Sequence, residues 1–259
     1  MLLWHYTSVE VLSSILGQAK PTLRATHINY LNDSVELKHG LDAIKNILIK
    51  THDPSVNDIV EDINELLDDN YDPHIFSFSL SEAKDSLYQW LAYCPSNGGV
   101  SLGFEFSDTM VMEDVICVNN AFELPLPNYP SSQIPQYRKC NYFLSEIDIK
   151  TDWYRPQNGK TTKANLLTNA MFLKHSAFHF EQEHRLFFHP MPNSQFYVPA
   201  KFQGSKPYVD FHFDPKILKY VCVSPRGNKD IGVKIVKKIL STYGFNHVEV
   251  IVSSIPFRE

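Results

Sequence analysis

Hydrophobic and polar residues follow a helical period in several stretches of the chain. Apolar residues three and four positions apart predict amphipathic helices, and a capping signal precedes two of them. Thr7 and Glu10 open the first helix, which ends before Gly17, and Asp33 and Glu36 open the second. The apolar faces of the first three helices are Val9, Leu12, Ile15 and Leu16; Leu37, Leu41, Ile44 and Leu48; and Val56, Val60, Ile63 and Leu67. Further helices are predicted at residues 86–94, with Asp85 as the cap, 162–178 and 230–243.

Other stretches alternate with the period of two that is typical of half-buried strands. Phe76, Phe78 and Leu80 alternate with Ser77 and Ser79 in the plainest example. The predicted strands are residues 4–6, 23–30, 76–80, 100–106, 114–122, 138–144, 184–189, 208–213, 218–223 and 248–253. Residues 124–136, with four prolines, are the one extended loop, and strands on both sides of it belong to one antiparallel or mixed sheet. The pattern predicts a single α+β domain over residues 1–259.

Composition and charge restrict the cellular location and the binding partners that this domain can have. No stretch approaches the ~18 consecutive apolar residues of a membrane span, and the first 30 residues lack a signal-peptide pattern. The four cysteines lie far apart among apolar neighbours, which indicates buried, reduced thiols. A formal net charge of −5 argues against a general nucleic-acid coat, although residues 138–174 carry seven bases against three acids. We therefore expect a soluble cytoplasmic protein without membrane contact.

Two short segments carry side chains that could form a binding site. His5 ends a strand just before a capped helix, whose N-terminus could receive a phosphate or a carboxamide. The alternative is that His5 is simply packed and hydrogen-bonded. Ser77-Phe78-Ser79, followed by Trp90 and Tyr93, could form the wall for a flat ring, although core packing explains these aromatic residues equally well.

Residues 181–185 form the most enzyme-like local pattern. Glu183 and Arg185 have the same parity, so they share one face of a strand and can form an ion pair. His175, His179 and Glu183 are spaced by four, as metal ligands on a helix would be, but Ser176 stands where a zincin helix carries its general base. We therefore predict no metal. Phosphate-loop, nucleophile-elbow and dinucleotide-binding glycine motifs are absent from the sequence.

In order, these segments resemble an uncharacterised, mostly bacterial family known only as domain of unknown function 2971. The resemblance runs from His5 to Arg258. It rests on His5-Tyr6-Thr7-Ser8, Leu31-Asn32-Asp33 with Glu36, Phe76-Ser77-Phe78-Ser79, Trp90-x-x-Tyr93, Gly99-x-x-x-Gly103-Phe104, Lys174-His175-Ser176-Ala177-Phe178 with Glu181, Glu183 and Arg185, and Ile255-Pro256-Phe257-Arg258.

The order of a histidine on the opening strand, a tyrosine on an extended segment and a glutamate on a late strand is also distantly similar to ADP-ribosyltransferases. That resemblance implies a mixed or antiparallel split sheet with flanking helices, and NAD as a co-substrate without a metal. It implies that His5 holds the adenosine-side ribose, that Tyr30, or else Tyr6 or Phe78, stacks on nicotinamide, and that Glu183 is catalytic. The remaining expected binding residues are Tyr6, Thr7, Asn32, Ser77, Phe78, Ser79, Trp90 and Arg185.

The leading hypothesis is thus an ADP-ribosyltransferase-like enzyme, such as a toxin or phage-defence effector. Its expected partners are NAD, a protein or nucleic-acid acceptor, and a cognate inhibitor. The alternatives are a metal-dependent hydrolase that uses His175 and His179, and a non-catalytic binding module. Whether His5 and Glu183 face one pocket distinguishes these hypotheses.

Overall fold

A computed structural model describes residues 1–31, 36–68, 70–106, 115–117, 136–142, 162–188 and 199–257. Within these ranges eleven strands belong to one sheet. The strands are β1 (Leu2–Thr7), β2 (Thr22–His27), β3 (Phe76–Ser81), β4 (Val100–Glu105), β5 (Val115–Cys117), β6 (Gln136–Lys139), β7 (Glu183–Phe188), β8 (Lys201–Gln203), β9 (Lys206–Phe213), β10 (Leu218–Val223) and β11 (Glu249–Val252). The α-helices are α1 (Val9–Leu16), α2 (Glu36–Lys50), α3 (Asn57–Leu66), α4 (Leu87–Tyr93), α5 (Thr162–Ala170) and α6 (Lys229–Thr242). Short 3₁₀ helices are η1 (Ile28–Tyr30), η2 (Pro54–Val56), η6 (Ser176–Glu181) and η7 (Pro215–Ile217).

The sheet runs in the order β11-β10-β4-β1-β3-β2-β9-β5, with β7 on β3, β6 on β7 and β8 on β9. The pairing of β10 with β11 is parallel, and the other pairs are antiparallel. The fold is therefore α+β with a mixed, mostly antiparallel open sheet, as the sequence pattern predicts.

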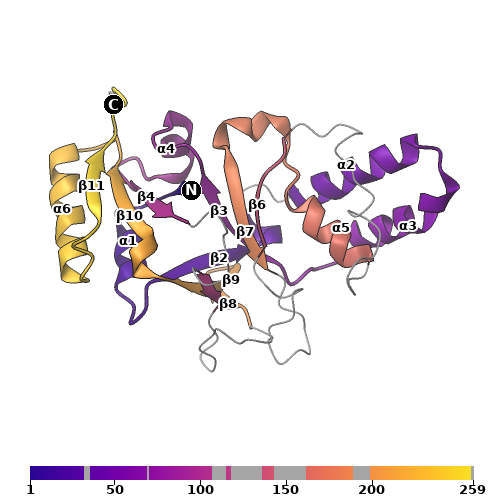
Figure 1. Cartoon of the computed structure of the whole chain (residues 1–259), viewed down its shortest axis with the longest axis horizontal. Helices are drawn as coiled ribbons and strands as arrows, with labels where there is room; N and C mark the ends of the chain where they lie inside the picture. Colours follow the sequence, from indigo (N-terminus) through magenta and orange to yellow (C-terminus); the bar gives the residue numbers. More distant parts are fainter. Residues whose placement is uncertain are drawn as a thin grey trace.

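The α-helices other than α4 gather at two ends of the molecule (Figure 1). Helices α1 and α6 lie beside β10 and β11, and the core between them includes Leu12, Val221 and Val236. Helices α2, α3 and α5 form a second group, packed around Leu41, Ile63 and other apolar residues. Helix α2 thereby brings its first residue, Glu36, to the β7 side of the sheet, where Glu36 pairs with Arg185.

The ends of three helices differ from the sequence predictions. The cap of α1 is Ser8, whose hydroxyl accepts from Val11 N, and not Thr7, which is still part of β1. Asp85 does not cap α4; its carboxylate instead accepts from the Trp90 indole at 2.7 Å and from the C-terminal segment. Helix α5 ends at Ala170, well before residue 178, because Lys174 leaves the helical path to enter a buried ionic cluster. The predicted Asp33 cap lies outside the described residues.

The thiols of Cys94, Cys140 and Cys222 are buried and unbridged, and the apolar neighbours of Cys94 and Cys222 predict this for those two. Within the described residues, every helix is too short or too polar to serve as a membrane span.

Candidate functional site

A cavity of about 480 Å³ opens where the sheet forks. Residues of β1, β2, β3, α4 and η6 line it, together with Glu36 of α2 and Glu183 of β7. This volume lies within the ordinary range of sites for small molecules and cofactors.

The fork arises because β3 has two neighbours on one of its edges. At one end Ser77 pairs with Thr26 of β2, and at the other end Ser81 pairs with Trp4 of β1. The opposite edge of β3 is paired with β7 along its whole length. Strand residues alternate in the direction of their main-chain polar groups, so those of Ser77, Ser79 and Ser81 point to the same edge of β3. The main-chain groups of Ser79 face the fork, where no described strand pairs with them.

The side chain of His5 occupies this gap and bonds the unpaired strand edge. Its Nδ1 lies 3.0 Å from the Ser79 carbonyl, and because a carbonyl only accepts, Nδ1 must carry the proton. Burial lowers the pKa of His5, although the bond to Ser79 opposes the shift. The ring is therefore neutral near pH 7, with Nε2 as a free acceptor, and it packs against Phe78 at a centroid distance of 4.4 Å.

The serines along β3 differ in how well they are satisfied. Ser81 donates to the Glu181 carbonyl at 2.6 Å and accepts from Ala83 N at 3.1 Å. Ser77 is equally buried and lines the cavity, but its hydroxyl has no hydrogen-bond partner among the described residues. A buried hydroxyl without a partner costs free energy, so this position suits a polar ligand atom.

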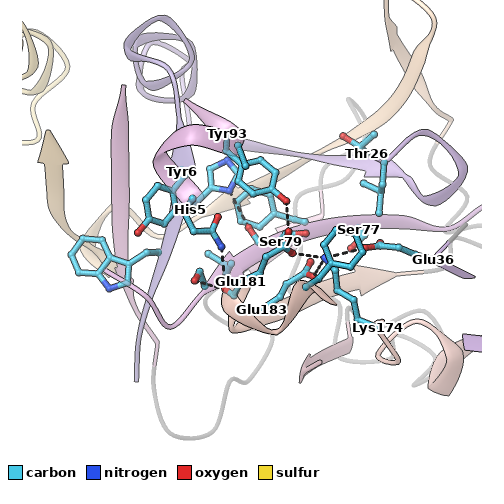
Figure 2. A pocket seen from close by; sticks show the side chains of 18 of the residues that line it. His5, Tyr6, Thr26, Glu36, Ser77, Ser79, Tyr93, Lys174, Glu181 and Glu183 are labelled. Atoms are coloured by element: carbon cyan, nitrogen blue, oxygen red, sulfur yellow. Dashed lines mark hydrogen bonds and ion pairs between the residues drawn. The ribbon is translucent and has the colours of Figure 1, made fainter. Parts of the chain in front are cut away.

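Five buried ionisable side chains converge at the other end of the cavity, as Figure 2 shows for Glu36, Lys174, Glu181 and Glu183. Lys174 Nζ contacts Glu183 Oε2 at 2.7 Å, Glu36 Oε1 at 3.0 Å and Glu181 Oε2. Arg185 binds both oxygens of Glu183 at 2.9 Å and contacts Glu36 Oε2 at 2.8 Å. The ion pair predicted from the parity of Glu183 and Arg185 is thus present.

Two of the three glutamates in this cluster, Glu181 and Glu183, have opposite pKa shifts. Burial alone would raise the pKa of Glu183, but Arg185 and Lys174 outweigh it and hold the pKa well below the usual range. Burial raises the pKa of Glu181, against the opposing effect of Lys174. Glu183 is therefore a fixed carboxylate, whereas Glu181 is the carboxyl that takes up a proton more readily. Pairs with diverging pKa values are typical of acid–base sites.

The backbone at Gln182 explains why both glutamates reach Lys174. Gln182 ends η6 in the left-handed conformation, with φ of 44° and ψ of 48°, and β7 begins at the next residue. This reversal directs Glu181 and Glu183 toward one ammonium group even though they belong to different elements. The Tyr93 hydroxyl, from α4, closes the cluster by donating to Glu181 Oε1 at 2.9 Å.

The structure brings seven of the predicted site residues to one cavity: His5, Tyr6, Tyr30, Ser77, Phe78, Ser79 and Glu183. Tyr6 is fixed there, because its hydroxyl donates to the Ala83 carbonyl at 2.6 Å and accepts from Ser86 N at 3.1 Å. Tyr30 contacts the ring of His27 edge-on and leaves much of its own ring exposed.

Three predicted binding residues, Thr7, Trp90 and Arg185, are not among the residues that line this cavity. Thr7 pairs with Val100, and its carbonyl faces the Cys94 thiol. Trp90 is fully buried beneath Tyr6, with its indole N–H held by Asp85. Arg185 lies behind Glu183, where its guanidinium also donates to the Met171 carbonyl. Asn32, also predicted, lies outside the described residues.

Several lining residues have no role in the sequence predictions. Glu36 marks only a helix start in the sequence, and Lys174 falls within a predicted helix. Gln89 donates to the Glu181 carbonyl at 3.1 Å, and Arg24 and Lys206 add positive charge on the β2 and β9 side. Besides the parity of Glu183 and Arg185, the spacing of Lys174, Glu181 and Glu183 is a local signal that could have revealed the cluster.

His175, His179 and Glu183 do not lie on one helix in the structure. His175 precedes η6 and accepts from Ala177 N, while His179 bonds the Ser176 carbonyl and stacks on Phe180. Glu183 instead lies in β7. In the part of the chain that the structure describes, no group of three His, Cys, Asp or Glu side chains could hold a metal ion.

Comparison with known proteins matches part of the chain to a protein family. Residues 89–186 match the model of a family described as "Protein of unknown function (DUF2971)", which supports the family resemblance for that part of the chain. Neither the curated proteins nor the solved structures include a significant match.

Proposed function

We propose that the cavity binds NAD and that the protein is an ADP-ribosyltransferase-like enzyme. In this reaction the bond between the ribose carbon and the nicotinamide nitrogen breaks, and its electron pair stays with nicotinamide. A nucleophile on a protein or nucleic-acid acceptor then bonds the ribose carbon and loses its proton. The observation that carries the proposal is that His5 and Glu183 line one cavity.

The free atoms around the cavity suit such a substrate. His5 Nε2 can accept from a ribose hydroxyl, since Nδ1 is committed to Ser79. The Ser77 hydroxyl can bond a further polar group. Lys206 provides positive charge for a diphosphate, together with Arg24, which also contacts Asp210 and Gln203. Tyr30 and Phe78 offer aromatic surface to a ring.

Glu183 has the properties that the departing nicotinamide requires. A carboxylate offers about four lone-pair positions. Arg185 and Lys174 use three of those of Glu183, so Oε1 can still accept from a ribose hydroxyl. A buried, fixed negative charge at this point would stabilise the positive charge that develops on the ribose carbon.

The close pairing of Glu183 with two cations also suits a second function, a nucleotide-binding module without turnover. Titration of the protein with NAD, followed by measurement of released nicotinamide, separates the two. Binding with release supports the transferase, and binding without release supports the module. Absence of NAD binding would contradict both proposals.

A further inference from the structure

The charges of the buried cluster do not balance. Glu36, Glu181 and Glu183 provide three carboxylates, and each is buried. Among the described residues, the cations in contact with them are Lys174 and Arg185. Full ionisation would leave one excess negative charge in a site that water barely reaches, which is costly unless a proton or another cation compensates it.

Of the three carboxylates, Glu181 contacts the fewest cations. Glu36 contacts both cations, and so does Glu183. Glu181 contacts only Lys174, and its second oxygen is bound by the neutral phenol of Tyr93. Burial raises the pKa of Glu181 accordingly, with Glu183 adding to the shift.

The groups around Glu181 come from four elements and leave its carboxyl on the cavity wall. Tyr93 and Gln89 reach it from α4, and Ser81 from β3; Gln89 and Ser81 bond only its main-chain carbonyl. Glu183 and Arg185 of β7 and Glu36 of α2 complete the charged neighbours, joined through Lys174. Tyr142 accepts from Glu183 N, and Cys140 lies beside Arg185; burial raises the pKa of both, so they stay neutral.

We infer that this end of the cavity takes the positively charged part of a ligand, and that this charge displaces a proton carried by Glu181 in the empty protein. The Glu181 O–H bond breaks, its electron pair stays on the carboxylate, and the proton goes to solvent. The aromatic rings of Tyr93 and Phe178 also line the wall and can contact a flat cation. The inference rests on the proposed function in naming this cation as the nicotinamide ring of NAD.

NAD and NADH are matched probes, because the reduced ring is neutral and nearly the same in shape. Calorimetric titrations from about pH 5 to about pH 8, run at each pH in two buffers that hold that pH and differ in their enthalpy of ionisation, measure the protons exchanged on binding. We expect NAD binding to release up to one proton. Below the pKa of Glu181, NAD affinity should therefore increase by up to about tenfold for each unit that the pH rises. NADH binding should release none.

Two variants test whether Glu181 is the group that carries the proton. Glu181→Gln should abolish both the proton release and the pH dependence, while circular dichroism confirms its fold. Tyr93→Phe removes a donor to the carboxylate, so the release should move to higher pH. Infrared difference spectra provide a further readout, in which the stretch of a protonated carboxyl is lost on NAD binding and is absent from Glu181→Gln.

The outcomes separate this inference from the proposed function. Equal heats for NAD in both buffers across the pH range, or unchanged proton release by Glu181→Gln, would overturn the inference while NAD binding itself stands. If neither dinucleotide binds, the NAD proposal fails, and N-methylnicotinamide and neutral nicotinamide become the probes. Binding of the cation alone with proton release would still support the inference, and failure of the cation to bind would overturn it.

Discussion

The imidazole of His5 donates to the main-chain carbonyl of Ser79, 3.0 Å away, at the fork between β1 and β2. A side chain thereby satisfies a strand edge that would otherwise be open, and the second ring nitrogen is left as an acceptor. The same bond therefore links the stability of the fork with the chemistry of the cavity.

The two roles of His5 can be separated by substitution. His5→Ala removes both nitrogens, whereas His5→Asn can keep a donor near the position of Nδ1 and lose Nε2. We expect His5→Ala to lower the free energy of unfolding by about 1 kcal/mol, and His5→Asn to preserve it. Both variants should lose NAD affinity in calorimetric titration. Wild-type affinity in a folded variant would remove His5 from the site.

The same histidine predicts a pH dependence of stability. Its pKa is lowered from 6.5 in the folded protein, so the unfolded chain binds the proton first as the pH falls. The free energy of unfolding should therefore decrease on acidification below about pH 6.5, until the folded pKa is reached. Urea denaturation should show a weaker decrease for His5→Asn than for the wild type over this window. Parallel curves would contradict the assignment.

Ser77 and Ser81 form a matched pair on β3. Ser77→Ala removes a hydroxyl without a partner, so the unfolding midpoint should not fall, while NAD affinity should weaken by about tenfold if a ligand atom uses it. Ser81→Ala removes two hydrogen bonds and should lower the free energy of unfolding by about 1–3 kcal/mol. A destabilised Ser77→Ala with unchanged NAD affinity would show that Ser77 serves the fold.

Lys174 should be the most sensitive position of the ionic cluster. Lys174→Met leaves three buried carboxylates with Arg185 alone, and breaking such a pair costs about 3–5 kcal/mol. Lys163 is the control, because its contacts with Asp62 and Glu65 are exposed, and Lys163→Met should hardly move the unfolding midpoint. Equal effects of the two substitutions would mean that the cluster is not tightly coupled.

The left-handed backbone at Gln182 gives an independent check of the site geometry. Gln182→Gly relieves the positive φ and should be at least as stable as the wild type, whereas Gln182→Val should lose about 1–3 kcal/mol. Thermal denaturation of both variants measures the difference. A valine variant as stable as the glycine variant would show that this turn does not constrain Glu181 and Glu183.

The sequence predicts those parts of the structure that depend on local periodicity. Phe76, Phe78 and Leu80 define β3, and the shared parity of Glu183 and Arg185 predicts their pairing, because strand alternation fixes both. Contacts across the sheet are not encoded in this way. The place of Glu36 depends on how α2 packs, and its sequence context indicates only a helix start.

Competing local preferences explain the errors. The residues after Ala170 have helical character, but the ionic partners of Lys174 outweigh that preference and end α5 early. Trp90 has a ring large enough to stack on a ligand, yet its indole N–H donates to the Asp85 carboxylate inside the core. In both cases a polar partner a few residues away along the chain decides the outcome, and helical periodicity does not identify such a partner.

Nicotinamide release from NAD by Glu183→Gln tests the central proposal most directly. Gln keeps the shape of the side chain but removes the charge, so turnover should fall by ~10²–10³. NAD affinity should change far less, since the charge acts mainly in the transition state. Glu82→Gln, whose carboxylate binds His184 and Lys139 and does not line the cavity, is the control and should keep wild-type turnover. A folded Glu183→Gln variant that releases nicotinamide at the wild-type rate would contradict the proposed role of Glu183.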